Sequence, residues 1–218
     1  LSSFSPDASQ IAEYKKIFDA LDAQPPEFQG DRAIVLDLRG NKGGSSTWPQ
    51  KVAEHIWGKQ AVDWALADYF RHTEVWYLAD SANIAHFRNA AEKMRERGLV
   101  DLAEWAEGLS NSLQSTSAKG QRFFREPYGK QLLSSAKPTT QRRTPPIYVV
   151  IDGGCVSACL DAVDIFTRFR NVKLVGAPTS ADTEYLEIRR QRLPSGRGSV
   201  ILPTKIWINR PRKAGQVY

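Results

Sequence analysis

Short apolar runs and longer amphipathic stretches alternate along the chain. Apolar side chains recur every three or four positions in residues 8–23, which predicts an amphipathic helix. Continuous apolar runs with β-branched residues occupy residues 33–38, 147–152 and 173–177 and predict three strands. The first of these runs is expected to be buried on both faces. Another helix is predicted for residues 157–169, between the last two strands.

The middle of the chain has a helical pattern, whereas its last quarter has a strand pattern. Residues 49–108 carry apolar side chains at helical spacing among many Ala, Glu and Arg residues, which predicts helices. Polar breaks are expected at residues 110–120 and 137–146. Two β runs, residues 183–193 and 199–208, flank a Pro-Ser-Gly turn and predict a hairpin.

This order of elements predicts an α/β protein with a largely parallel sheet. The insertion between the first two strands is about a hundred residues long, too long for a plain crossover. We therefore predict a core formed by residues 1–48 and 146–218, which ends in a β-rich part, and a mainly helical insertion, or cap, over residues 49–145.

The charge of the chain is unevenly distributed. Its 218 residues carry a net charge of +6, and basic residues gather between Tyr185 and Lys213. A nucleic-acid surface is one interpretation of this excess, but no nucleic-acid-binding motif accompanies it. A solvated strand face, or attraction to acidic peptides and carboxylates, is favoured instead. No apolar run is long enough to span a bilayer. The chain opens without Met, so we expect a piece of a longer protein.

The two cysteines, Cys155 and Cys159, are four residues apart. In a helix they would share one face with parallel Cα–Cβ vectors, a poor geometry for a disulfide. Two thiols without neighbouring histidines make no zinc site. The sequence therefore predicts two small buried residues, with no metal and no cofactor.

A glycine-rich turn follows the first predicted strand. The stretch DLRGNKGG, residues 37–44, lies where ligands gather in open α/β sheets. Its glycines allow a tight turn and leave N–H groups that could bind an anion or an oxyanion. Asp37 and Arg39 are expected to make structural hydrogen bonds around this turn. The spacing matches neither a dinucleotide site nor a P-loop.

A second turn, GGCVSACLD, follows the next predicted strand. Ser157 would stand at the first turn of a helix, where a serine usually serves as the N-cap. Its hydroxyl would also lie beside free N–H groups, including that of Ala158. If the two strands pair, one turn offers N–H donors and the other a hydroxyl. Together they form half of an acyl-transfer site.

Three blocks of sequence resemble a known family. VLDLRGNKGG, then YVVIDGGCVSACLDAVDIF, then KLVGAPTS occur in the order found in the C-terminal processing (tail-specific) serine peptidases. These peptidases are relatives of the tricorn core and of interphotoreceptor retinoid-binding protein. The resemblance covers residues 1–48 and 146–202. It implies a Clp-protease/crotonase-like core of stacked strand-strand-helix units.

The resemblance also implies roles for individual residues. Ser157 falls on the nucleophile of the family, and the N–H groups of Ala158 and of Gly43 or Gly44 fall on its oxyanion hole. The family places a general-base lysine 25 residues after the serine, but this chain has Asp182 there. The second serine and the glutamate of the family's S-A-S-E block are altered as well.

The general base must therefore come from elsewhere, or the site is inactive. The tricorn branch uses a histidine N-terminal to the first block. This chain has only His55, His72 and His86, all in the insertion, and His55 is the nearest of them to the glycine turn. Asp182 could orient a histidine. Lys205 could replace the missing lysine from the neighbouring hairpin.

Two functions remain open from the sequence. The first is a serine-type peptidase that hydrolyses a peptide or protein substrate through Ser157. The second is an inactive domain of the same fold that binds a peptide or an apolar ligand. A crotonase-like acyl-CoA enzyme would not need Ser157, and no nucleotide pocket is indicated. The resemblance further implies export to the periplasm or the extracellular space.

Overall fold

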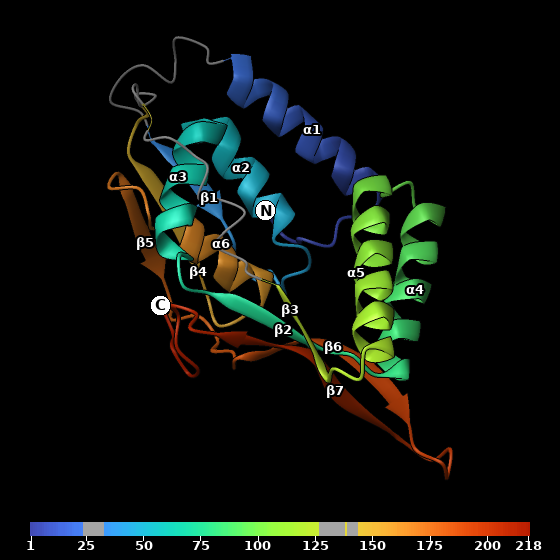
Figure 1. The fold of residues 1–218 in the computed structure, drawn as a ribbon. Helices are drawn as coiled ribbons and strands as arrows, with labels where there is room; N and C mark the ends of the chain where they lie inside the picture. Colours follow the sequence, from blue (N-terminus) through green and yellow to red (C-terminus); the bar gives the residue numbers. More distant parts are fainter. Residues whose placement is uncertain (24–32, 127–137, 139–143) are drawn as a thin grey trace. The chain divides into compact units, whose positions relative to one another are not determined.

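The computed structural model describes residues 1–23, 33–126, 138 and 144–218 (Figure 1). It divides into two compact units, each built from separate stretches of the chain. Unit 1 comprises Leu1–Arg71, Gly129–Thr183 and Pro211–Tyr218, and unit 2 comprises His72–Tyr128 and Glu184–Arg210. The predicted linker at residues 137–146 lies mostly outside the described residues.

Unit 1 contains a parallel sheet of three strands. The strands are β1 (Ile34–Asp37), β4 (Ile147–Ile151) and β5 (Val172–Gly176), in the order β1-β4-β5. Asp37 pairs with Val150, so β1 and β4 end side by side. The predicted strands and their parallel arrangement are confirmed. The prediction that β1 is buried on both faces was wrong, because β1 is an edge strand of this sheet and Val35 is 61% exposed.

Four helices accompany this sheet: α1 (Ala8–Ala23), α2 (Thr47–Trp57), α3 (Lys59–Tyr69) and α6 (Ala158–Phe166). Helix α1 has the predicted bounds. Helix α6 follows the second turn, and its apolar residues are almost entirely buried, which makes it a core helix of the unit. Its first turn therefore has a fixed place against the ends of the strands.

Unit 2 contains an antiparallel sheet with a helical pair. Its strands are β2 (Glu74–Leu78), β3 (Phe123–Glu126), β6 (Tyr185–Arg192) and β7 (Ser199–Ile208), in the order β3-β2-β7-β6. Helices α4 (Ser81–Glu96) and α5 (Val100–Ala118) run side by side (Figure 1). Tyr77, Phe87 and Trp207 are buried in one cluster. The predicted hairpin is confirmed as β6 and β7.

Strand β2 was missed by the helical prediction for residues 49–108. Its side chains alternate between buried and half-buried positions, as in a strand with one covered face. Its neighbour β7 pairs Trp207 with Val75 from far along the chain. A partner so distant in sequence gives no local signal, and the alternation in β2 is only five residues long.

The polar break predicted at residues 110–120 was also wrong, since α5 continues to Ala118. Ser110 Oγ donates to Ile84 O of α4, and Thr116 Oγ1 donates to Ser112 O one turn earlier. These hydroxyls are thus satisfied within the helical pair and do not interrupt the helix.

The compact units divide the chain at residues other than 48 and 146. Helices α2 and α3, predicted to lie in the insertion, belong to unit 1, and strands β6 and β7 belong to unit 2. The division into a core and a helical cap stays a prediction. Within the described residues, no helix combines the length and apolarity needed to cross a membrane.

Candidate active site

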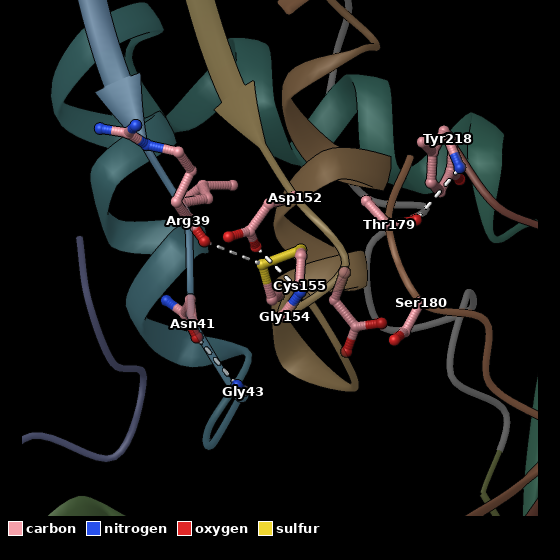
Figure 2. Close-up of a disulfide and its surroundings, with 12 residues drawn as sticks. Arg39, Asn41, Gly43, Asp152, Gly154, Cys155, Thr179, Ser180 and Tyr218 are labelled. Atoms are coloured by element: carbon pink, nitrogen blue, oxygen red, sulfur yellow. Dashed lines mark hydrogen bonds between the residues drawn. A yellow bond between two sulfur atoms is a disulfide. The ribbon is translucent and has the colours of Figure 1, made fainter. Parts of the chain in front are cut away.

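One carboxylate joins the two turns that follow β1 and β4. Asp152 Oδ1 accepts the N–H of Gly40 at 3.0 Å. It also accepts the N–H of Gly154 at 2.9 Å (Figure 2). The backbones meet so closely that a Cβ on Gly154 would lie 2.8 Å from Gly40 Cα. The expectation that the two turns lie side by side is confirmed, and Asp152 is their shared acceptor.

Asp37 instead binds its neighbour Arg39, as predicted. Asp37 Oδ2 lies 2.6 Å from Arg39 Nη2, and the side-chain hydrogen bonds from Arg39 lower the pKa of Asp37 to about 2. Both side chains are exposed, so solvent screens the pair.

Asn41 organises the glycine turn from within. It is fully buried, and its Oδ1 accepts the Gly43 N–H at 2.8 Å (Figure 2). Its backbone oxygen accepts the Val156 N–H at 3.3 Å, and its Nδ2 donates to Leu1 O at 2.8 Å. We did not single this residue out from the sequence, although asparagine between glycines is typical of a turn.

The two glycines of this turn are required for different reasons. Gly43 has a φ of +86°, and a Cβ there would lie 2.9 Å from both Ala158 N and Ser157 Cβ. Gly44 has a φ of +135°, and a Cβ there would lie 2.1 Å from Phe4 O. Gly43 therefore faces the serine turn, while Gly44 faces the N-terminal segment. No other residue type fits either position without a shift of the backbone.

Ser157 has a backbone conformation that is rare for an L-residue. Its φ is +56° and its ψ is −123°, a conformation that costs a non-glycine residue about 1–3 kcal/mol. It stands at the N-cap of α6, but its side chain makes no capping hydrogen bond. The usual structural reason for a serine before a helix is therefore absent. A strained serine at a sharp strand-to-helix turn is typical of an exposed nucleophile.

Two backbone N–H groups are candidates to bind an oxyanion: that of Ala158, next to Ser157 in the chain, and that of Gly44 in the glycine turn. Ala158 is the first residue of α6, so its N–H has no acceptor within the helix, and it lies at the positive end of the helix dipole. In the described part of the chain, no hydrogen bond from Gly44 N to a carbonyl occurs either. The Gly43 N–H, in contrast, already binds Asn41.

The two cysteines form a disulfide, which corrects the sequence prediction (Figure 2). Their Cα atoms lie 5.2 Å apart, and both residues are fully buried, as predicted. Helix α6 begins only at Ala158, so Cys155 lies in the turn before it. The argument from parallel Cβ vectors fails because it placed both residues in one helix.

Asp182, at the position of the family lysine, binds a buried arginine. The Arg212 side chain is fully buried and donates to Asp161 at 2.7 Å, to Asp164 at 2.9 Å and to Asp182. Burial by itself would lower the pKa of Arg212, but the carboxylates, led by Asp164, raise it above its usual value. Asp182 is thus an acceptor in a structural ion cluster, and Arg212 remains a cation.

The cluster extends to the end of the glycine turn and to Tyr218. Ser46 Oγ, just after the glycine turn, donates to Asp161 Oδ2 at 2.6 Å. Asp164 Oδ1 accepts the hydroxyl of Tyr69 at 3.0 Å and that of Tyr218. Burial and the Asp164 charge raise the pKa of Tyr69 to about 12, so this hydroxyl stays protonated as a donor. Sequence reasoning counted Arg212 only within the basic excess.

The candidate bases have their own partners. His55 stacks on Phe18 with ring centroids 4.4 Å apart, and its Nδ1 lies 2.7 Å from Asp22 Oδ1, both on α1. Lys205 Nζ lies 2.9 Å from Glu187 Oε2 within unit 2. His72 and His86 also belong to unit 2. None of the hydrogen bonds found in the described ranges joins one of these side chains to Ser157.

Several solved structures can be aligned with nearly the whole chain. The chain is 14% identical to mature CPAF with a TM-score of 0.51, and 15% identical to mature CPAF complexed with lactacystin with a TM-score of 0.52. Both alignments cover 98% of this chain but 43% of CPAF. The photosystem II D1 C-terminal processing protease aligns with 98% of this chain and 38% of its own, at 13% identity and a TM-score of 0.39.

The sequence profile of peptidase family S41 matches residues 1–211, nearly the whole chain. A search of curated proteins found no match. The structural similarity to CPAF shows a mixed α/β fold with parallel and antiparallel sheets. The resemblance read from the three sequence blocks is therefore confirmed, and this chain belongs to peptidase family S41.

Proposed function

We propose that this chain is part of a serine peptidase in which Ser157 attacks the carbonyl carbon of a peptide bond. The observation that carries the proposal is the backbone of Ser157, which has positive φ and leaves the hydroxyl without a capping role. Strain of this kind persists where the surrounding structure enforces it, and such residues cluster at active sites.

The neighbouring groups support the same chemistry. In the proposed step, Ser157 Oγ bonds to the carbonyl carbon and its proton passes to a general base. The N–H groups of Ala158 and Gly44 would bind the resulting oxyanion. Gly43 would contribute space and not a donor, because its N–H is bound to Asn41 and its Cα side faces Ser157.

The general base is proposed to lie outside this chain. Asp182 binds Arg212 and Lys205 binds Glu187, so these two side chains are engaged elsewhere. Asp22 could orient His55 as a base, but no hydrogen bond in the described residues joins His55 to Ser157. This chain spans 43% of the length of mature CPAF, which leaves room for such a residue elsewhere in the parent protein.

The fold and the disulfide support two further parts of the proposal. Strand, turn and helix recur as β1 with α2 and as β4 with α6, which is consistent with the stacked units of a Clp-protease/crotonase-like core. A disulfide is typical of exported proteins, because the cytosol keeps thiols reduced. We therefore propose an exported peptidase that acts on peptide or protein substrates.

A catalytically inactive, peptide-binding domain is the second candidate. The ion pair of Asp182 with Arg212 favours it, because a carboxylate held by a guanidinium stands where the family has its base lysine.

Labelling with a fluorophosphonate separates these two functions. The probe would be applied to this chain, to a longer chain extended upstream of Leu1, and to the Ser157→Ala form of each. Ser195→Ala, in the exposed hairpin turn, serves as the matched control. Labelling that Ser157→Ala abolishes and Ser195→Ala preserves is expected in the extended chain. No labelling of either chain would favour the binding domain.

A further inference from the structure

The Cys155–Cys159 disulfide encloses the candidate nucleophile in a very short loop. Ser157 is the middle residue of the five that the S–S bond closes into a ring, and Ala158 is its neighbour in the same ring. The two groups that the proposed reaction needs from this turn therefore both lie between the bonded cysteines. A closure this short restricts the backbone angles of every residue inside it.

The ring is fixed to the rest of unit 1 at both ends. Cys155 N donates to Asp152 O at 3.0 Å, directly after β4. Cys159 Sγ lies 3.9 Å from Leu38 O at the end of β1, a van der Waals contact, because a disulfide sulfur carries no hydrogen to donate. Both cysteines are fully buried, so their positions are set by the core.

Hydrogen bonds also restrain Ser157 inside this ring: Cys159 N donates to Val156 O at 3.0 Å, and Leu160 N donates to Ser157 O at 2.8 Å. Val156 N is 3.3 Å from Asn41 O, and Gly43 approaches Ser157 from the glycine turn without a side chain. These contacts limit where the turn can lie, but none of them bonds to Ser157 Oγ. Within the described residues, the S–S bond is the one covalent cross-link that spans residue 157.

We infer that the Cys155–Cys159 disulfide is a positioning group that holds residue 157 at positive φ, so that the serine hydroxyl is presented to substrate and does not cap α6. Only the effect on catalysis, the presentation of the hydroxyl to substrate, rests on the proposed function. The backbone effect stands independently of it. Without the bond, Ser157 returns to negative φ, and its hydroxyl caps the free N–H groups of α6.

Reduction is therefore expected to switch the site off. A dithiol reagent would deliver two electrons and two protons to the S–S bond, producing two cysteine thiols and leaving the reagent as its own disulfide. Because both cysteines are buried, the exchange proceeds only when the turn opens locally.

The first test measures the coupling between the disulfide and residue 157 without any assay of activity. Ser157→Gly relieves strain at positive φ, so it is expected to lower the equilibrium constant for unfolding about tenfold in the disulfide-bonded chain. In the Cys155→Ala/Cys159→Ala background the strain is gone, and the same substitution is expected to have no stabilising effect. Urea unfolding followed by circular dichroism gives both constants.

Asn209 provides the matched control. It also has a positive φ, +54°, but it lies in unit 2, away from any disulfide. Asn209→Gly is expected to change stability equally in both backgrounds. Equal stabilisation by Ser157→Gly with and without the cysteines would overturn the inference. Failure of every disulfide-free form to fold, including the dithiol-reduced chain, would overturn it as well, because the bond would then serve the whole unit.

The second test measures the catalytic consequence in the chain that fluorophosphonate labels. The double cysteine variant is expected to lower the labelling rate at saturating probe about tenfold to a hundredfold, with little change in the probe concentration for half-maximal rate. A general loss of structure would change both. An unchanged saturating rate would overturn the positioning role. If no chain is labelled, the proposed function fails, and the stability coupling still decides the inference.

Discussion

The turns after β1 and β4 occupy the same edge of one sheet, yet they are held by different means. The β1 turn relies on glycines at positive φ and on the buried amide of Asn41. The β4 turn places a serine at positive φ and adds a disulfide around it. Where a side chain is not needed, glycine adopts the conformation at little cost. Where a hydroxyl is needed, other bonds must offset the strain.

The two turns also differ in what supports them from behind. The ion cluster of Arg212 is attached mainly to the β4 side, through Asp161 and Asp164 of α6, and reaches the β1 side through Ser46. The comparison therefore predicts a gradient of effects. Changes to the shared cluster should cost most, changes between the turns less, and changes to a single polar contact least.

Replacing Arg212 with methionine is expected to have the largest effect. It leaves the fully buried carboxylate of Asp164 and the partly buried carboxylates of Asp161 and Asp182 without their common cation, and breaking such a cluster costs about 3–5 kcal/mol. Urea unfolding would measure the loss in free energy of unfolding. Arg197→Met, in the exposed hairpin turn, is the control and should change little. A loss below about 1 kcal/mol would show that the cluster is not a main support of the site.

Gly43→Ala is expected to have the next largest effect. A Cβ at this position would lie 2.7 Å from Val156 O and 2.9 Å from Ser157 Cβ, so the turns must move apart. Strain and displacement together should cost about 2–3 kcal/mol and abolish labelling of Ser157.

Gly40→Ala separates these two contributions. Gly40 has a φ of +69°, but a Cβ there would meet no atom within 4 Å. It should therefore show only the conformational cost, about 1 kcal/mol, and keep its labelling. Equal losses at positions 40 and 43 would mean that the close approach of the turns is unimportant.

Asn41→Ala is expected to cost about 1–3 kcal/mol, because it leaves the buried Gly43 N–H without its acceptor. The rate of fluorophosphonate labelling should fall as well, because Gly43 is no longer held by Asn41 and the N–H of the adjacent Gly44 is then less well positioned. Amide hydrogen exchange at Gly43 would report the lost hydrogen bond directly. Protection of that amide at the wild-type level would contradict the role given to Asn41.

The sequence predicted the sheet of unit 1 and the two turns well, for a clear physical reason. Helix α1 follows from the spacing of its apolar residues, and strands β1, β4 and β5 follow from short apolar runs. The glycines indicate where the backbone needs a positive φ. Strand β2 could not be recovered in this way, because its identity depends on pairing with β7. The disulfide was missed because the prediction treated Cys155 and Cys159 as parts of one helix, whereas α6 begins at Ala158 and Cys155 lies in the turn before it.

The supports of the site were less predictable than its centre. Ser157, Gly43 and Ala158 stand in recognisable blocks, so their proximity followed from parallel strand pairing. Arg212 lies far from its three carboxylates in the chain, and no local pattern distinguishes it from the other late basic residues. Only the fold reveals that its side chain is buried.

Asp152→Asn is expected to have the smallest effect on the free energy of unfolding, and it tests how the two turns are linked. Both N–H groups, from Gly40 and Gly154, bond to the same oxygen, Oδ1, so the amide oxygen of asparagine can accept both. Only the contribution of the negative charge is lost, about 1 kcal/mol. Asp152→Ala removes the acceptor from both turns at once and should cost about 2–3 kcal/mol. Urea unfolding of the two variants therefore tests whether the turns are joined by a shared acceptor or by charge. Similar losses in both variants would assign the link to the carboxylate charge, and the shared-oxygen geometry would then be secondary.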